Sequence, residues 1–350
     1  MAEIIKNKKP EKGQAAWQHR EILRAVNQSV RSQHEGAELI GQGWAAADLH
    51  VHTWCSYDVA PVPFNAPLFL YEKAVRSGMK FITFTDHDTM DAYDQIGWTR
   101  ERIVPGAEIK ILDRRRVGHT VHMNVYQLDM KKFLELEEIV EKSGNIELLI
   151  ACIKSHKLPY IYNHPFWHEP NEKLNIRAVF DLMSLFSVLE YNMGRVNPLN
   201  QIAAYLARST GKGLVAATDT HSGRIAEAYT LARGDSFAGF MAEIRAGRSL
   251  LVSQDLTLAR LTSEVLDRLN CMFNQEHWQF AKPGFSLETG ISILDDHIQK
   301  IILASASENN MLKKMLKWLM TGVALSKIPH SLYIRSQNLL AKSVLQGMPA

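Results

Sequence analysis

Short apolar runs alternate with longer amphipathic segments through the middle of the chain, from residue 45 to about residue 256. The runs that fit buried strands span residues 45–51, 80–85, 102–111, 120–128, 158–163, 186–192 and 213–218. Strands separated by helix-length segments are typical of parallel strands joined by crossover helices. The pattern therefore predicts an α/β domain, built as either a barrel or an open sheet.

Four amphipathic segments between these runs predict helices, at residues 66–79, 129–144, 197–211 and 237–247. Several of them close on a glycine, the residue that most readily takes the left-handed conformation at a helix C-terminus.

Two flanking regions follow a different pattern. Residues 1–44 are polar, and the segment 21–33 predicts a helix in a leader outside the main core. Apolar positions at helical spacing in the segments 256–273, 291–306 and 309–325 predict a helical region after the α/β domain. We therefore expect a leader (1–44), an α/β domain (45–256) and a helical C-terminal region (257–350).

The segment 311–325 carries an apolar stripe along one predicted helix face, with Lys313, Lys314 and Lys317 near its edges. The stripe comprises Met311, Leu312, Met315, Leu316, Leu319 and Met320. Such a face could pack on the α/β domain, form a homo-oligomer interface or lie on an anionic membrane surface. Three lysines supply little charge for membrane binding, so packing on the domain is the expectation.

Two histidines one residue apart, His50 and His52, follow the first apolar run. On a strand, residues i and i+2 point to the same face, so the two imidazoles would lie side by side. Such a pair can bind a divalent metal, or it can be two hydrogen-bonded histidines of the core.

Histidines and carboxylates recur where the other apolar runs end. They are Asp86, His87 and Asp88, then Glu108, His119, His122, His164, His168, Glu190, Asp219 and His221. Because α/β folds build their sites at the carboxyl ends of strands, we expect these side chains to form a ring there. A ring of anionic oxygens and neutral imidazoles is costly to bury without compensation, and metal cations would provide it.

Composition excludes several classes of protein. The 40 basic and 37 acidic residues nearly balance, which gives no strong signal for nucleic-acid binding. Three cysteines without a C-x-x-C pair fit a reducing, cytoplasmic setting and exclude a cysteine-built zinc finger. We expect no secretory signal and no transmembrane segment, because no uninterrupted apolar run reaches the ~18 residues that a membrane-spanning helix needs.

The order and spacing of six motifs resemble the PHP (polymerase and histidinol phosphatase) domain over residues 45–250. The motifs are H-x-H-T-x-x-S-x-D at 50–58, T-D-H-D at 85–88, G-x-E at 106–108, a histidine in the next strand, N-H-P at 163–165 and D-x-H at 219–221. The resemblance implies a distorted (β/α)7 barrel with a cluster of two or three divalent ions, commonly zinc, manganese or iron.

The resemblance also implies three groups of ligands. The first metal would be held by His50, His52, Glu108 and Asp219. Glu108 would bridge to a second metal, held by His122 and His164. The third would be held by Asp58, His87 and His221.

The function implied is a metal-dependent phosphoesterase that cleaves a small phosphorylated metabolite or nucleotide with a metal-activated hydroxide. Asp219 or His221 could handle a proton, and either Arg224 or Arg195 could clamp the substrate phosphate or be an ordinary loop arginine. His119 and His168 are expected to be structural. The alternatives are hydrolysis of an amide or another ester by the same hydroxide, and a non-catalytic PHP module. All nine ligand positions are filled, which argues against the latter.

Overall fold

The computed structural model describes residues 26, 28–169, 171–273 and 311–348. Its strands are β1 (Val30–Arg31), β2 (Ala45–Ala47), β3 (Gly106–Leu112), β4 (Thr120–Tyr126), β5 (Tyr160–Tyr162), β6 (Val188–Asn192), β7 (Gly213–Ala217), β8 (Tyr229–Ala232) and β9 (Leu250–Val252). Its helices are α2 (Gln33–Gly41), η1 (Pro63–Asn65), α3 (Pro67–Arg76), α4 (Asp91–Ile96), α5 (Met130–Ser143), α6 (Ile146–Ser155), α7 (Ile176–Leu182), η2 (Met183–Leu185), α8 (Asn197–Ser209), α9 (Phe237–Arg245), α10 (Leu258–Phe273), α12 (Met311–Leu325) and α13 (Ile328–Gly347).

The strands form two sheets, one in the order β1-β9-β8-β2 and one in the order β3-β4-β5-β6-β7. β5, β6 and β7 are parallel, as predicted, but β3 and β4 pair antiparallel, and so do β4 and β5. The segment 113–119 between β3 and β4 is too short for a crossover helix, so these two strands form a hairpin. Within the described residues the two sheets do not close into one continuous barrel.

Several predicted strands are shorter than their apolar runs. β2 ends at Ala47, so His50 and His52 lie beyond the strand, and the run 80–85 contributes only a single bridge between Ile82 and Ile103. The segment 21–33 was predicted as a helix, and its described residues Val26, Gln28 and Ser29 are helical. Val30 and Arg31, however, form β1, which pairs parallel with β9. This part of the leader is therefore attached to a sheet of the α/β domain.

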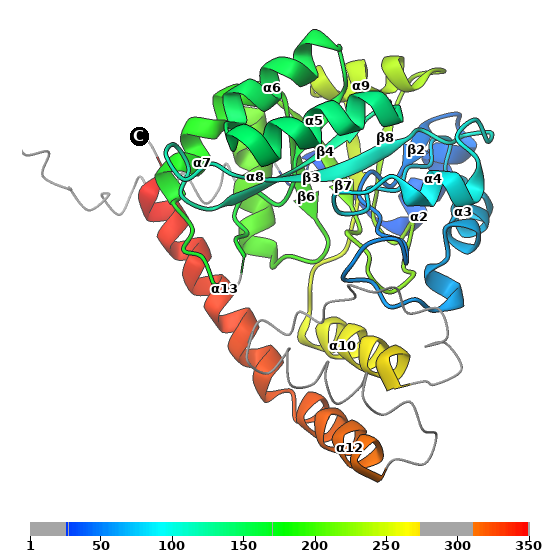
Figure 1. Ribbon diagram of the computed structural model, residues 1–350, viewed down its shortest axis with the longest axis vertical. Coiled ribbons are helices and arrows are strands. Elements are labelled where there is room, and N and C mark those ends of the chain that lie inside the picture. The colour runs from blue at the N-terminus through cyan, green and yellow to red at the C-terminus, as the bar shows by residue number, and fades with distance from the viewer. Residues whose placement is uncertain (1–25, 27, 170, 274–310, 349–350) are drawn as a thin grey trace, which may run out of the picture.

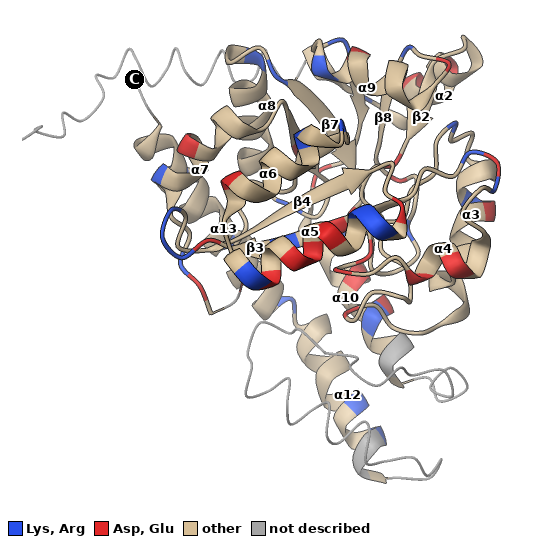
Figure 2. Cartoon of the chain, turned by 45° about the horizontal axis from the view of Figure 1, so that its top comes forward, with Lys and Arg blue, Asp and Glu red and all other residues tan. Residues whose placement is uncertain are grey.

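The four predicted helices are present as α3, α5, α8 and α9. In α5, the Asp129 side chain accepts a hydrogen bond from the backbone N–H of Lys132, and Gly144 closes the helix in the left-handed conformation (φ 54°). Lysines lie near the two ends of α5 and acidic residues lie between them (Figure 2). The pattern missed α6, which carries apolar residues over most of its surface and therefore lacks a clear polar face.

The C-terminal helices lie on one side of the α/β domain (Figure 1). α13 runs back toward the domain, contacts α7 and α8, and buries Ala341 and Val344 in the main core. Helix α12 was expected to pack on the domain, but it packs on α10 and α13, where Leu316 and Met320 cover a small cluster with Leu269.

Much of the apolar stripe of α12 remains exposed, including Met311, Met315 and Leu319. The predicted helix at 291–306 lies outside the described residues. No helix in the described part of the chain combines the length and apolar composition needed to cross a membrane.

The buried hydroxyl of Tyr93 joins two segments that carry candidate ligands. It donates to the carbonyl of Phe84 (2.5 Å) and accepts from the backbone N–H groups of Phe84 (2.9 Å) and Gly106 (2.8 Å). The first segment leads to His87, and the second is the start of β3, which carries Glu108. Tyr93 thus fixes the spacing between these two side chains.

We predict that Tyr93→Phe lowers the free energy of unfolding by at least ~2 kcal/mol, because buried backbone groups lose their partner. Urea unfolding would measure the loss. Tyr71→Phe is the control, since its hydroxyl donates to the carbonyl of Glu101 at the surface and its loss should cost far less. Equal stability losses in the two variants would contradict the role of Tyr93.

Candidate metal centre

All nine residues predicted as metal ligands meet in one buried region at the end of the strands. Their donor atoms form four overlapping groups in which all atoms lie within 4.8 Å of one another. The groups are His50, Glu108 and His164; His50, His52 and Asp219; His87, Glu108 and His122; and His52, Asp58, His87 and His221.

Three donor atoms of the first predicted group lie close together. His50 Nε2 lies 3.1 Å from both His52 Nε2 and Glu108 Oε2, and 3.4 Å from Asp219 Oδ1. His52 Nε2 lies 3.3 Å from the same Glu108 and Asp219 oxygens. Donors about 2.0–2.1 Å from a tetrahedral zinc ion are ~3.3 Å apart. The atoms of His50, His52 and Asp219 therefore have the spacing of ligands to one ion, and Glu108 Oε2 adjoins both imidazoles.

Glu108 faces two groups of imidazoles with its two oxygens. Oε2 faces His50 and His52, whereas Oε1 lies 3.1 Å from His122 Nδ1 and 3.4 Å from His164 Nε2. Asn163 Nδ2 also donates to Oε1, at 2.7 Å. The carboxylate has the placement that a bridging ligand requires.

Asp58 lies beside the imidazoles of the third predicted group. Its Oδ2 is 2.7 Å from His221 Nε2 and 3.6 Å from His87 Nε2. His87 also reaches Glu108, because its Nδ1 lies 3.1 Å from Oε2. The third group therefore adjoins the first rather than forming a separate site.

Hydrogen bonds orient two of the imidazoles for metal binding. His50 Nδ1 lies 2.8 Å from Glu190 Oε1, and His221 Nδ1 lies 2.9 Å from the carbonyl of Asp219. Because both partners can only accept, Nδ1 carries the proton and Nε2 keeps its lone pair for a metal. The sequence marked Glu190 as a carboxylate in an apolar run but did not assign it this role.

Glu169 is a further carboxylate that the sequence did not indicate. Its Oε1 lies 3.4 Å from His122 Nε2, and no motif includes it. It follows His168, whose Nδ1 bonds to the carbonyl of Glu169 at 2.8 Å. His119, predicted to be structural, accepts from the backbone N–H of Asn175 through Nδ1 (3.3 Å).

The site concentrates negative charge. Burial opposes charge on His50, but Glu108, Asp219 and Glu190 outweigh it and raise the His50 pKa well above its ordinary value. Burial likewise opposes ionisation of Glu108, yet the imidazoles of His50, His87 and His122 hold the pKa of this carboxyl well below its usual range.

The other carboxylates follow the same trend. Despite burial, imidazoles hold the pKa values of Asp58 and Asp219 well below the ordinary value as well. For His87, by contrast, burial outweighs the neighbouring carboxylates and lowers the pKa. Carboxylates held ionised beside imidazoles form a donor set suited to a divalent cation, whose binding would release the proton that the raised pKa favours on His50.

Unpaired and strained groups in the site are a second observation that fits a metal cluster. The buried Nδ1 of His87, which lies 3.1 Å from Glu108 Oε2, has no hydrogen-bond partner among the described residues, and a buried donor or acceptor is rarely left unpaired. In addition, His164 and Asp219 hold left-handed backbone conformations (φ 24° and 51°) that side-chain-bearing residues seldom adopt. Such strain persists only where the surroundings enforce it, and it is concentrated at functional sites.

A cavity of about 660 Å³ opens over the candidate ligands. Arg195 and Arg224 both line it, as do Trp167 and His168. The guanidinium of Arg224, predicted to clamp a phosphate, instead pairs with Asp267 of α10 at 2.5 Å. This pairing ties α10 to the loop after His221.

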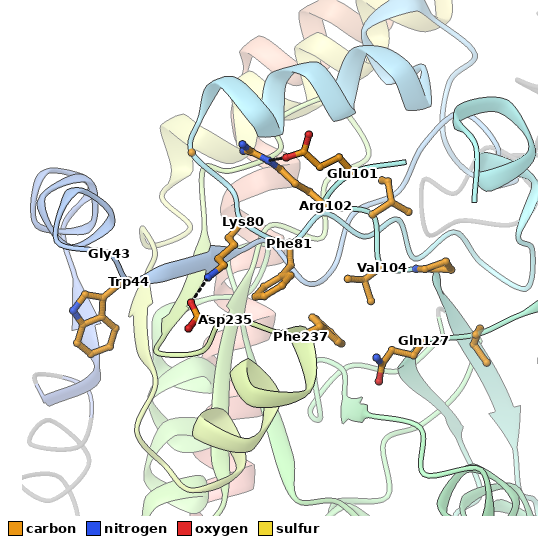
Figure 3. Close-up of a pocket in the computed structure, with 14 residues that line it drawn as sticks. Gly43, Trp44, Lys80, Phe81, Glu101, Arg102, Val104, Gln127, Asp235 and Phe237 are labelled. Carbon is orange, nitrogen blue, oxygen red and sulfur yellow. Dashed lines mark hydrogen bonds and ion pairs between the residues drawn. The ribbon is translucent and has the colours of Figure 1, made fainter. Parts of the chain in front are cut away.

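A second cavity, of about 880 Å³, contains none of the candidate ligands (Figure 3). It is lined by the segments that lead into the apolar runs, including Trp44, Phe81 and Phe237. The ion pair between Lys80 and Asp235 (3.0 Å) crosses one side of it. The candidate ligands that border a cavity, such as His87 and Asp219, line the smaller of these two.

Comparison with known proteins gives only distant similarities. No protein-family model matches the chain, and no curated protein matches it significantly. Among solved structures, PsfC from Pseudomonas syringae PB-5123 is similar over 64% of this chain and 98% of its own, with 16% identity and a TM-score of 0.47.

Two further structures match about half of this chain and 87% of their own, each with 15% identity. One is a protein assigned as a metal-dependent phosphoesterase from Bifidobacterium adolescentis (TM-score 0.36), and the other is an amidohydrolase from Chromobacterium violaceum with bound sulfate and no metal (TM-score 0.37). At these scores, the function has to be inferred from the side chains of this chain.

We predict that Glu108→Gln reduces the metal content by at least one ion per chain, because a neutral amide cannot bridge two cations. Elemental analysis after loading with manganese or zinc would measure this. Glu172→Gln is a matched control, since Glu172 binds the start of β4 through Thr120 and faces no candidate ligand. A Glu108→Gln protein that keeps the full metal content would show that Glu108 is not a ligand.

Proposed function

We propose that this chain is a metal-dependent phosphoric ester hydrolase that acts on a small phosphorylated metabolite or nucleotide. The observation that carries the proposal is the close group of donor atoms from His50, His52 and Asp219, which Glu108 adjoins and extends toward His122 and His164. The proposed ligands are His50, His52, Asp58, His87, Glu108, His122, His164, Asp219 and His221. The cofactor would be two or three divalent ions of manganese, zinc or iron.

When bound, such ions would supply positive charge to offset the anionic substrate and a water molecule of lowered pKa. The protein's own contribution is to hold the donors in place. Glu190 fixes the tautomer of His50, and Asn192 donates to Asp219 Oδ2 at 3.0 Å, which turns Oδ1 toward His50 and His52. The cavity then gives a substrate access to one side of the cluster.

Asp219 and His221 are the proposed proton-handling residues. Both line the cavity, so their side chains can reach a group that enters it. The His221 ring is held by the carbonyl of Asp219, which keeps Nε2 directed toward Asp58. Arg224 is not proposed as the phosphate clamp, because Asp267 and Ser263 already engage its guanidinium.

We also propose that the domain is organised as a distorted (β/α)7 barrel. Contacts outside the two sheets support this by linking the ends of the five-stranded sheet. Val51 bridges Thr220 after β7 and accepts from the backbone N–H of Thr85, and His87 bridges Glu108 in β3. In the proposed barrel, the segments at 50–52 and 82–87 would lie between β7 and β3 and complete a ring of seven.

We predict that protein purified without chelator and loaded with manganese carries two or three metal ions per chain. It should then hydrolyse a generic chromogenic phosphate ester, and a chelator should abolish the activity. Fewer than one ion per chain after loading would refute the metal centre. A full metal content with hydrolysis of amides or carboxylic esters, but not of phosphate esters, would favour the alternative hydrolase.

A further inference from the structure

The C-terminal helices form one wall of the cavity above the candidate metal centre. α10 and α13 lie on the side of the domain where the cavity opens, and residues from both line it. They are Leu261, Glu264, Val265 and Arg268 from α10, and Tyr333, Ser336 and Gln337 from α13. The region after residue 257 therefore borders the site, although none of the nine candidate ligands lies in it.

Arg195 is the residue through which α13 approaches the centre. It lies in the loop between β6 and α8, and its side chain is 16% exposed. The guanidinium lies over the ring of Trp167, 5.4 Å from the ring centroid, and Nη1 lies 3.4 Å from the hydroxyl of Tyr333. An aromatic face on one side and a hydroxyl at the tip hold the group at the cavity wall.

The guanidinium of Arg195 has more donors than partners. Arginine presents five N–H groups in a planar fork, but the one hydrogen bond that the Arg195 guanidinium makes with the described residues is the long contact with Tyr333. Its Nε is buried without a partner, and Nη2 stands 3.7 Å from Asp219 Oδ2, which already accepts from Asn192. A partly buried cation with unsatisfied donors is suited to an oxyanion that enters the cavity.

Resting on the proposed hydrolase function, we propose that Tyr333 of α13 is a positioning residue that holds Arg195 to bind a phosphate-type oxyanion of the substrate. Tyr333 accepts from Nη1 and keeps the guanidinium directed toward the cavity. The guanidinium already forms a loose ion pair with Asp219 Oδ2, at 3.7 Å. Without the Tyr333 acceptor, the guanidinium could close on this carboxylate, which would engage its donors and remove the oxyanion contact. The C-terminal helical region is thus part of the substrate site.

Binding of inorganic phosphate to the manganese-loaded, full-length protein tests this proposal, with calorimetry as the measurement. We expect Arg195→Gln to weaken phosphate binding at least tenfold and Tyr333→Phe to weaken it about threefold to tenfold. Metal content should be unchanged in both variants. Tyr71→Phe, whose hydroxyl lies at the surface away from this cavity, should bind phosphate as the wild type does.

The double variant distinguishes positioning from a general structural role. If Tyr333 acts through Arg195, Tyr333→Phe should cause no further loss of phosphate binding in the Arg195→Gln background. Additive losses, or wild-type affinity in Tyr333→Phe, would overturn the proposal while leaving the hydrolase function intact. A wild-type protein that holds its metals but binds no phosphate and cleaves no phosphate ester would instead overturn the proposed function, and this inference with it.

Discussion

The buried carboxylate of Glu108 is the interaction on which the arrangement of the site depends. An ionised carboxylate in the interior is costly unless charges or hydrogen bonds compensate it. Here the compensation comes from His50, His87, His122 and Asn163, which belong to four different segments. Each segment must be placed within hydrogen-bond distance of β3 for Glu108 to be tolerated. One side chain therefore couples the packing of distant parts of the domain to the geometry of the site.

The candidate ligands could be predicted from the sequence because each belongs to a short and distinctive motif. Two of these motifs can be recognised in the sequence without knowledge of the fold: the pair His50 and His52, and the pair Asp219 and His221. Glu169 and the role of Glu190 could not be predicted, because they depend on long-range contacts. Glu190 acts on a histidine 140 residues away, and no local pattern reports such a contact.

Fold class and the amphipathic helices followed from periodicity, but strand direction and pairing did not. Alternation of apolar runs and helices favours parallel strands in general, and it describes β5 to β7 correctly. The hairpin of β3 and β4 departs from this general pattern, because the connection between the predicted runs 102–111 and 120–128 is too short for a crossover helix. Amphipathicity also shows that a helix buries one face, but it does not show which element that face contacts. The packing of α12 on α10 was missed for this reason.

The candidate ligands and the C-terminal wall of the cavity are made at different times during synthesis, because they lie far apart along the chain. Domains generally fold from the N-terminus during synthesis. All nine candidate ligands precede residue 222, whereas Tyr333 lies more than a hundred residues further along the chain. A growing chain could therefore bring its candidate ligands together, and acquire ions, well before α13 closes the wall beside Arg195. Such an order would keep a nascent chain from engaging its substrate until α13 has been made.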